Sequence, residues 1–253
     1  SLISSICYSQ TNRFVDPTGT DSGDCSQFGV PCSTINYAIS QASAGDFIYL
    51  SDGTFANATI SKRVTVKGRG TSTIIQGITL NAPVSGSELI HLKSLSISSA
   101  SSVGATIEVS FVTLEDVNIS GHSSRNLDIN ASGDITNIIV ENSVLDNGGA
   151  GLWIDEDTGV DGLTVLNTSM NGNTFGLYSQ FGDETNSNTV TNVTIRNCTF
   201  SNNLQKGIYA EKLDNAVFEN ISIINSGTDA TYAFNNGIDL NLKWQAYSNI
   251  TIR

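Results

Sequence analysis

A short pattern in this sequence places aromatic and acidic residues at regular intervals. The pattern reads Gly-apolar-x, and its copies are Gly151-Leu152-Trp153, Gly176-Leu177-Tyr178, Gly207-Ile208-Tyr209 and Gly237-Ile238-Asp239, with Asn126-Leu127-Asp128 as a variant. Alternate side chains of an extended strand point to opposite faces. If the apolar residue of each copy points inward, the third residue points outward. The predicted outward strip consists of Asp128, Trp153, Tyr178, Tyr209 and Asp239.

This strip combines two side-chain types that suit sugars. Aromatic rings stack on the apolar faces of pyranoses, and carboxylates accept hydrogen bonds from hydroxyl groups. Trp153, Tyr178, Tyr209 and Asp239 are therefore candidate carbohydrate-binding residues. The alternative is that the rings form a ladder that only stabilises the sheet.

Carboxylates on neighbouring strands could also hydrolyse a glycosidic bond by acid/base catalysis. The candidate catalytic pair is Asp155, two residues after Trp153, with either Glu211 or Asp128. We expect all of these side chains on the same outward face.

The acidic stretch 155–161 is the one candidate Ca²⁺ site of the sequence, and a solvated turn is the alternative. Its carboxylates belong to Asp155, Glu156, Asp157 and Asp161. No other cofactor or metal site is predicted, because His91 and His122 each stand alone, without the spacing of metal ligands.

A second pattern alternates with the first and predicts the turns of the fold. It is an apolar-x-apolar strand ending in Asn or Asp, and its copies end at Asp116, Asn142, Asn167, Asn197 and Asn220. Asparagine tolerates the left-handed backbone conformation of a sharp bend. We predict that the four asparagines stack as a structural ladder at a buried corner, each amide bonding the next.

The two interleaved patterns together predict the fold class. Their copies recur every 23 to 31 residues, which leaves no room for a crossover helix between parallel strands. Each coil must then stack on the previous one, with a rise of about 4.8 Å. We predict an all-β, right-handed, single-stranded parallel β-helix over residues 47–253, closed at its N-terminal end by a capping helix.

The cap is predicted over residues 14–46. Ser33–Ser43 places apolar residues on one helical face, with Ser33 or Thr34 as N-cap and Gly45 at the end. Cys25 and Cys32, seven residues apart, are predicted to close a small disulfide loop, which indicates an oxidising compartment. The pairing of Cys7 and Cys198 is left open.

The charge of the chain excludes some partners. Its formal net charge is −12, and only 14% of its residues are charged. Nucleic acid is excluded, because phosphate binding needs clustered Lys and Arg. Membrane insertion is also excluded, because no apolar run approaches the roughly 18 residues of a spanning helix. An acidic surface repels polyanions unless a local basic cleft or bound cations offset it.

One known family shares these features. The segment Asp16–Phe55 (DPTGTDSGDCSQFGVPCSTINYAISQASAGDFIYLSDGTF), followed by Asn-rich repeats, resembles the cap and first coils of secreted pectin-lyase-fold proteins. The resemblance covers nearly the whole chain from residue 14. It implies that a polysaccharide would lie along one outward sheet face. It does not select a function, because this fold serves lyases, polygalacturonases, epimerases, tailspikes, adhesins and surface-layer proteins alike.

Enzyme motifs of that family are largely absent. Polygalacturonases carry paired aspartates, Gly-His-Gly and Arg-x-Lys, whereas His122 here lies in Ser-Gly-His-Ser and the other two motifs are missing. The favoured hypothesis is therefore a secreted or cell-surface structural or adhesive protein. The alternative is a polysaccharide lyase, hydrolase or epimerase that acts on an extracellular glycan.

The ends of the sequence suggest self-association as one route to such a structural role. Residues 1–13 carry apolar side chains ahead of the cap and are predicted to form an intermolecular strand. The sequence ends in mid-strand, so we expect the last coil to be covered by further residues or by another chain. The predicted partners are therefore an extracellular polysaccharide or copies of the chain itself, which would assemble head-to-tail into a filament or surface layer.

Overall fold

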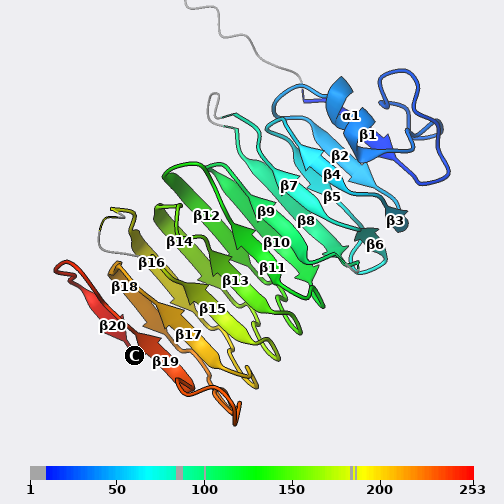
Figure 1. Ribbon diagram of the computed structural model, residues 1–253. Helices are drawn as coiled ribbons and strands as arrows, with labels where there is room; N and C mark the ends of the chain where they lie inside the picture. The colour runs from blue at the N-terminus through cyan, green and yellow to red at the C-terminus, as the bar shows by residue number, and fades with distance from the viewer. Residues whose placement is uncertain (1–9, 84–87, 100, 183–184, 186) are drawn as a thin grey trace, which may run out of the picture.

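The computed structural model describes residues 10–83, 88–99, 101–182, 185 and 187–253. These residues form a stack of coils with a single helix at one end (Figure 1). The strands belong to two sheets, and all of their pairings are parallel.

The larger sheet, called sheet A, runs along the whole stack. Its path is β1 (Asn12–Val15), β2 (Phe47–Leu50), β5 (Thr65–Lys67), β8 (Ile90–Ile97), β10 (Val112–Ile119), β12 (Ile135–Glu141), β14 (Val160–Leu166), β16 (Val190–Arg196), β18 (Leu213–Glu219) and β20 (Ile250–Ile252). Beside this path β3 (Gly53–Phe55) pairs with β6 (Thr73–Ile75), which also pairs with β8.

The smaller sheet, called sheet B, faces sheet A across the core. Its strands in spatial order are β4 (Ala58–Ile60), β7 (Ile78–Leu80), β9 (Val103–Ile107), β11 (Arg125–Ile129), β13 (Ala150–Ile154), β15 (Phe175–Ser179), β17 (Lys206–Ala210) and β19 (Asn236–Leu240). Neighbours in space are successive coils in sequence, which is the predicted parallel β-helix.

The core is built from equivalent residues of successive coils. On sheet B, Leu127, Leu152, Leu177 and Ile208 are in register and buried. On sheet A, buried apolar side chains likewise alternate with more exposed residues along each strand. Burying one such side chain contributes about 1.5–3 kcal/mol, so the repeated apolar columns hold the coils together.

The asparagine ladder forms, but it lies on the surface. Asn167 Nδ2 donates to Asn142 Oδ1 at 3.1 Å, Asn197 to Asn167 at 3.0 Å, and Asn220 to Asn197 at 2.8 Å. Their φ angles of 48–55° are left-handed, as predicted. The expectation of a buried corner is wrong, because all four side chains are exposed. In the αL conformation each side chain points outward at the bend.

A separate group of asparagines inside the fold was missed by the sequence reasoning. Asn126, Asn173 and Asn203 are fully or almost fully buried. Asn126 Nδ2 donates to Asn173 Oδ1 at 3.2 Å, and the Asn173 N–H donates to Asn203 Oδ1 at 2.9 Å. Gly148 lies between them, and a Cβ at that position would approach Asn126 Oδ1 to 2.6 Å. These side chains satisfy backbone groups at a buried turn.

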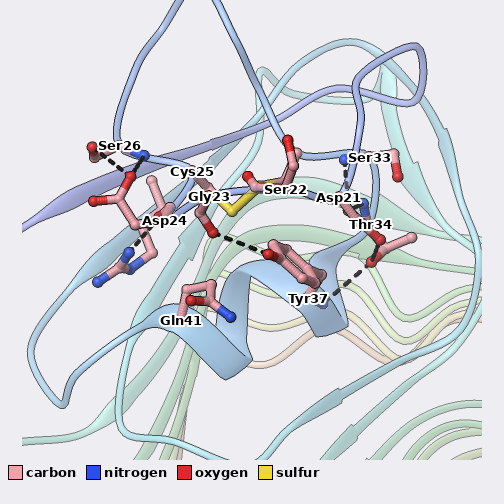
Figure 2. Close-up of a disulfide and its surroundings, with 12 residues drawn as sticks. Asp21, Ser22, Gly23, Asp24, Cys25, Ser26, Ser33, Thr34, Tyr37 and Gln41 are labelled. Carbon is pink, nitrogen blue, oxygen red and sulfur yellow. Dashed lines mark hydrogen bonds between the residues drawn. A yellow bond between two sulfur atoms is a disulfide. The ribbon is translucent and has the colours of Figure 1, made fainter.

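The cap contains the predicted disulfide and a helix at the predicted place, which ends at Gln41 rather than at Gly45. Helix α1 (Ile35–Gln41) begins at the N-cap Thr34, whose side chain accepts a hydrogen bond from the Tyr37 N–H, as expected of a capping residue. Cys25 and Cys32 form the disulfide, and Tyr37 donates to Gly23 O at 3.0 Å, which ties the loop to the helix (Figure 2).

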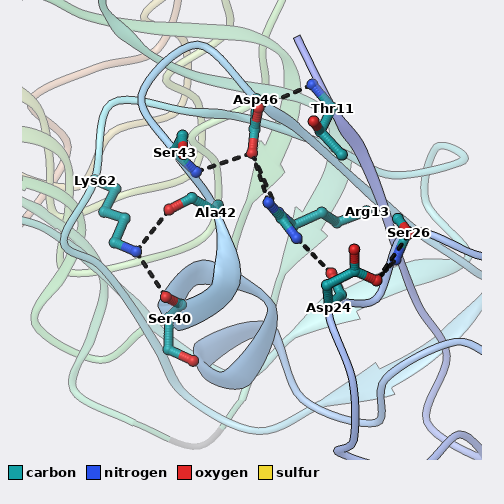
Figure 3. Close-up of polar contacts among 9 residues, drawn as sticks. All are labelled: Thr11, Arg13, Asp24, Ser26, Ser40, Ala42, Ser43, Asp46 and Lys62. Atoms are coloured by element: carbon teal, nitrogen blue, oxygen red, sulfur yellow. Dashed lines mark hydrogen bonds and ion pairs between the residues drawn. The ribbon is translucent and has the colours of Figure 1, made fainter. Parts of the chain in front are cut away.

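A buried ion pair fixes the cap on the first coils. Arg13 on β1 donates to Asp46, with Nη2 at 3.0 Å from Oδ2, and both side chains are almost completely buried. Asp46 also accepts from the N–H groups of Thr11 and Ser43, so its oxygens are well satisfied (Figure 3). A buried charge is tolerated only when it is paired and hydrogen-bonded in this way.

A second buried arginine, Arg63, joins three coils. Its guanidinium donates to the carbonyl oxygens of Ala82 at 2.9 Å, Pro83 at 3.1 Å, Ser110 at 2.6 Å and Phe111 at 3.1 Å. Arg63 is the donor to the Ala82, Pro83 and Ser110 carbonyls, whereas Phe111 O also accepts from the Ile90 N–H at 3.1 Å.

The predicted intermolecular strand, residues 1–13, is described only from residue 10 onward. Residues 1–9, including Cys7, lie outside the described residues, and the intermolecular strand stays a prediction. Asn12 and Arg13 instead belong to β1, which pairs with β2 of the same chain.

Cys198 is a free, buried thiol, and burial raises its pKa. In the described part of the chain no helix is long and apolar enough to cross a membrane.

Candidate functional site

The predicted strip forms one column on sheet B. Asp128, Trp153, Tyr178, Tyr209 and Asp239 are paired in register across β11, β13, β15, β17 and β19. The spacing of the Gly-apolar-x pattern therefore places these side chains one above another. The strip is less exposed than expected, since Asp128 and Tyr209 are buried by their neighbours.

The three aromatic rings of the column stack on one another. The Trp153 and Tyr178 centroids are 4.1 Å apart with planes at 18°, and the Tyr178 and Tyr209 centroids are 5.1 Å apart at 31°. A cation closes each end of the stack. The Arg125 guanidinium lies 4.3 Å from the Trp153 centroid, and Lys206 Nζ lies 4.1 Å from the Tyr209 centroid.

This arrangement covers the ring faces. Each ring has another ring or a cation against its faces, so the faces are occupied and the partly exposed rings meet solvent at their edges. Burial raises the pKa of Tyr178 to about 12 and raises that of Tyr209 as well, so both phenols stay neutral. The Tyr178 hydroxyl donates to Gln180 and the Tyr209 hydroxyl to Glu211, so the partly exposed rings offer a ligand their edges but not a free face.

At one end of the stack Arg125 brings two of the candidate carboxylates together. Its Nη1 lies 2.8 Å and 2.9 Å from the two oxygens of Asp128, and 3.3 Å from Oδ2 of Asp155. Because Nη1 contacts both carboxylates, at 2.8 Å and 3.3 Å, their nearest oxygens are at most about 6 Å apart. Asp155 reaches solvent, whereas the Asp128 side chain is only 6% exposed.

Burial separates the chemistry of these two acids. The pKa of Asp128 is raised, chiefly because burial disfavours its charged form, although Arg125 opposes this effect. The neighbouring charge of Asp155 raises it further. A buried carboxyl group with a raised pKa beside one that is open to solvent is an arrangement that suits acid/base hydrolysis.

Glu211, the third candidate, does not join this pair. It follows β17, two strands away from the β13 coil that carries Asp155. Its side chain is only 1% exposed, and it accepts from the Phe181 N–H at 3.0 Å, Tyr209 OH at 2.5 Å and Lys243 Nζ at 2.5 Å. Glu211 lies beside the column residue Tyr209, but it is not exposed to solvent, because loop residues and Lys243 enclose the carboxylate. Glu211 therefore holds the stack in place.

Asp239, at the other end of the column, is also engaged. It forms an ion pair with Lys206, the same lysine that lies over Tyr209.

The candidate calcium stretch is dispersed, since Asp161 lies on β14 and accepts from Asn192 Nδ2 at 2.5 Å. Among the described residues, no group of three or more His, Cys, Asp or Glu side chains is placed to hold a metal ion.

Two residues that organise the site, Arg125 and Lys206, were missed by the sequence reasoning. Both occupy the first position of their strands, three residues before the column residue Asp128 or Tyr209. The equivalent positions on the intervening strands are Ala150 and Phe175. A charged residue does not recur at this position from coil to coil. The only signal in the sequence is that Arg125 and Lys206 each come directly before a copy of the Gly-apolar-x pattern or its variant.

Comparisons with known proteins find similarity in structure. No protein-family model matches the chain, and no curated protein sequence matches it. The fold is similar to that of the pectate lyase Pel9A, with 16% identity and a TM-score of 0.55 over 92% of this chain and 62% of the lyase. It is also similar to a rhamnogalacturonan lyase, with 14% identity and a TM-score of 0.52 over 95% of this chain and 84% of that protein.

At these identities the likeness concerns the fold alone. The chain adopts the right-handed parallel β-helix of the pectin-lyase type, as its repeats predicted. It spans 62% of the length of the pectate lyase. No specific subfamily follows from these matches.

Proposed function

We propose that this protein acts on an extracellular polysaccharide that lies along sheet B. The observation that carries the proposal is the group of Asp128, Arg125 and Asp155 beside the aromatic stack. Two carboxyl groups at most about 6 Å apart suit hydrolysis of a glycosidic bond with retention of configuration. The structural likeness to two lyases of polysaccharides supports a glycan-acting protein at the level of the fold.

In the proposed reaction Asp155 is the nucleophile and Asp128 the general acid. Asp155 attacks the anomeric carbon and forms a glycosyl ester, while Asp128 protonates the departing glycosidic oxygen. Water then enters, Asp128 takes one of its protons, and the hydroxide oxygen displaces Asp155 from the sugar. Arg125 covers Asp128 in the free protein, so substrate binding must draw the guanidinium aside.

The aromatic stack serves this reaction as a rigid wall. Its ring faces are covered, so a bound chain would contact ring edges and the neighbouring polar groups. Asn130 and Gln180, which end the β11 and β15 coils as Asp155 ends that of β13, are exposed and add hydrogen-bonding groups in neighbouring coils. The Cys25–Cys32 disulfide supports a secreted or cell-surface location, because such bonds persist in oxidising compartments.

A screen of polysaccharides tests the proposal. The protein is incubated with neutral and uronic-acid polysaccharides, with and without Ca²⁺, and new reducing ends are measured. Hydrolysis should release reducing ends without the absorbance of an unsaturated product, and Asp155→Ala should abolish the release. Asp157→Ala, a nearby exposed acid outside the pair, is the matched control. Unsaturated product would instead identify a lyase and overturn the hydrolytic step.

A second candidate function is the structural or adhesive role. The observation that favours it is the covered ring stack, in which cations and rings satisfy one another as in a stabilising ladder. In this case the protein releases no sugar from any polysaccharide. Self-association, the finer part of this hypothesis, would appear as filaments or layers in electron micrographs of native material.

A further inference from the structure

A groove of about 450 Å³ lies on the first coils, among strands of sheet A rather than sheet B. It is lined by residues of β1, β2, the disulfide loop and the turn after β5. Figure 1 shows β1, β2 and β5 at the cap end of the stack. The residues that define its chemistry are Phe14, Asp16, Phe28, Tyr49, Lys67 and Arg69. Its volume falls within the roughly 300–1,000 Å³ of small-molecule sites.

Aromatic rings form one wall of the groove. Phe14 and Tyr49 are stacked with centroids 5.8 Å apart, and Phe28 meets Phe14 edge-on at 5.3 Å and 88°. Phe28 is 81% exposed, although it belongs to a loop closed by the disulfide. Unlike the rings of sheet B, this ring has an open face. An open aromatic face in a constrained loop suits contact with the apolar side of a sugar ring.

Two cations, Lys67 and Arg69, also line the groove. Lys67 is paired in register with Tyr49 on one side and with Lys93 on the other. Lys93 is neutralised by Glu115, with Nζ 2.5 Å from Oε1. In the described part of the chain neither Lys67 nor Arg69 contacts a carboxylate. Two unpaired cations side by side are unusual on a chain with a net charge of −12, and they attract an anionic group.

The carboxylate in the groove, Asp16, is hydrogen-bonded within its own turn. Asp16 accepts from the Thr18 N–H at 2.9 Å and from Thr18 Oγ1 at 2.6 Å. These hydrogen bonds lower the pKa of Asp16, so its charge persists at neutral pH. Asp16 does not reach Lys67 or Arg69 as an ion-pair partner. It remains able to accept a hydrogen bond from a sugar hydroxyl.

We propose that this groove binds an anionic saccharide unit, with its ring against Phe28 and its carboxylate or sulfate between Lys67 and Arg69. A neutral sugar would leave both cations unpaired, and an inorganic anion would leave the aromatic wall unused. The site is separate from Asp128 and Asp155, which lie on sheet B. It would let an acidic glycan dock at the cap end of a protein whose remaining surface repels it.

Ligand-observed NMR with small probes tests this site. The probes are methyl glucuronide, glucose 6-sulfate, methyl glucoside and inorganic sulfate. We expect at least one anionic sugar to bind about tenfold more tightly than methyl glucoside and inorganic sulfate, which corresponds to one unit in log Kd. The carboxylated and sulfated probes identify the preferred anion. Equal binding of the neutral sugar, binding of sulfate as tight as that of the anionic sugars, or no binding of any sugar overturns the proposal.

Variants separate the groove from the rest of the protein. Lys67→Met combined with Arg69→Met should raise Kd for the anionic sugar about tenfold, and Phe28→Ser should weaken binding of the sugar but not of sulfate. Arg196→Met, another exposed cation on sheet A, is the matched control. Asp155→Ala should leave binding here unchanged, which distinguishes this site from the proposed catalytic one. Equal weakening by Arg196→Met contradicts the proposal.

Discussion

Three carboxylates at the sheet B site, Asp128, Asp155 and Glu211, have the same kind of functional group but different surroundings. Asp155 reaches solvent, Asp128 is buried beside Arg125, and Glu211 is enclosed by Lys243, Tyr209 and a backbone N–H. Their roles follow from these contacts. An enclosed and fully bonded carboxylate stabilises the fold, whereas a buried one with a raised pKa can hold a proton.

The raised pKa of Asp128 predicts a pH-dependent stability. Above its ordinary value of 3.8, the folded state keeps a proton that the unfolded state has released. The free energy of unfolding contributed by this group therefore falls as pH rises through the interval up to the raised pKa, and stays low above it. Asparagine does not titrate. Urea unfolding from about pH 3 to about pH 8 should show wild type losing stability relative to Asp128→Asn. A constant difference across this range contradicts the assignment.

At the scale of residues, the sequence predicted the column of side chains on sheet B but not the cations that contact its carboxylates. The alternation of strand side chains is a local rule, so the repeat placed Trp153 and Tyr178 in register. Arg125 reaches two carboxylates through a long side chain, and Lys243 reaches Glu211 from a later coil. Such contacts depend on side-chain conformations and on loop paths, which no repeat records.

At the scale of elements, the bends between strands of successive coils carry the same residue type, asparagine. The exposed asparagine ladder satisfies two needs of a bend, a residue that tolerates positive φ and a bond to the next coil. Each bend needs a residue that tolerates αL backbone, and the bends recur once per coil. The spacing of the asparagines therefore predicted the members of this ladder. The buried group of Asn126, Asn173 and Asn203 escaped prediction because Asn126 occupies a glycine position of the repeat and bridges past Gly148 to Asn173.

Substitutions at Asn197 separate the two needs of the ladder. Asn197→Ala loses the hydrogen bonds to Asn167 and Asn220 and also strains the backbone at φ 55°. We expect the free energy of unfolding to fall by about 2 kcal/mol. Asn197→Gly keeps the backbone relaxed and should cost about 1 kcal/mol. Denaturant titrations measure both values, and an equal cost would show that αL strain does not contribute.

Arg63 joins neighbouring coils where the strand ladders do not. Arg63→Met removes hydrogen bonds to four carbonyl groups of the first coils, of which Phe111 O keeps the Ile90 N–H as a donor. We expect a loss of about 3 kcal/mol in the free energy of unfolding, because hydrogen bonds from a charged donor are strong and all four are at least partly buried. Arg69→Met, nearby but exposed, should change stability by less than about 0.5 kcal/mol. Similar losses in both variants would contradict this role.

The whole molecule carries two chemically different surfaces on a common stack of coils. Sheet B presents carboxylates beside covered rings, and the first coils of sheet A present two unpaired cations beside an open ring. The repeats predicted the stack, because each coil is a nearest-neighbour unit. They did not predict the groove, because it forms where the disulfide loop folds against β1 and β2, outside the repeats.

The most direct measurement of the central claim is the rate at which the protein releases reducing ends from its best polysaccharide. Wild type, Asp128→Asn, Asp155→Asn and the control Asp157→Asn are compared at equal concentration, with circular dichroism to verify folding. Loss of either member of the pair should lower the rate about 100-fold or more, while the control keeps the wild-type rate. Wild-type rates in both pair variants, or no release by wild type from any polysaccharide, would contradict the account.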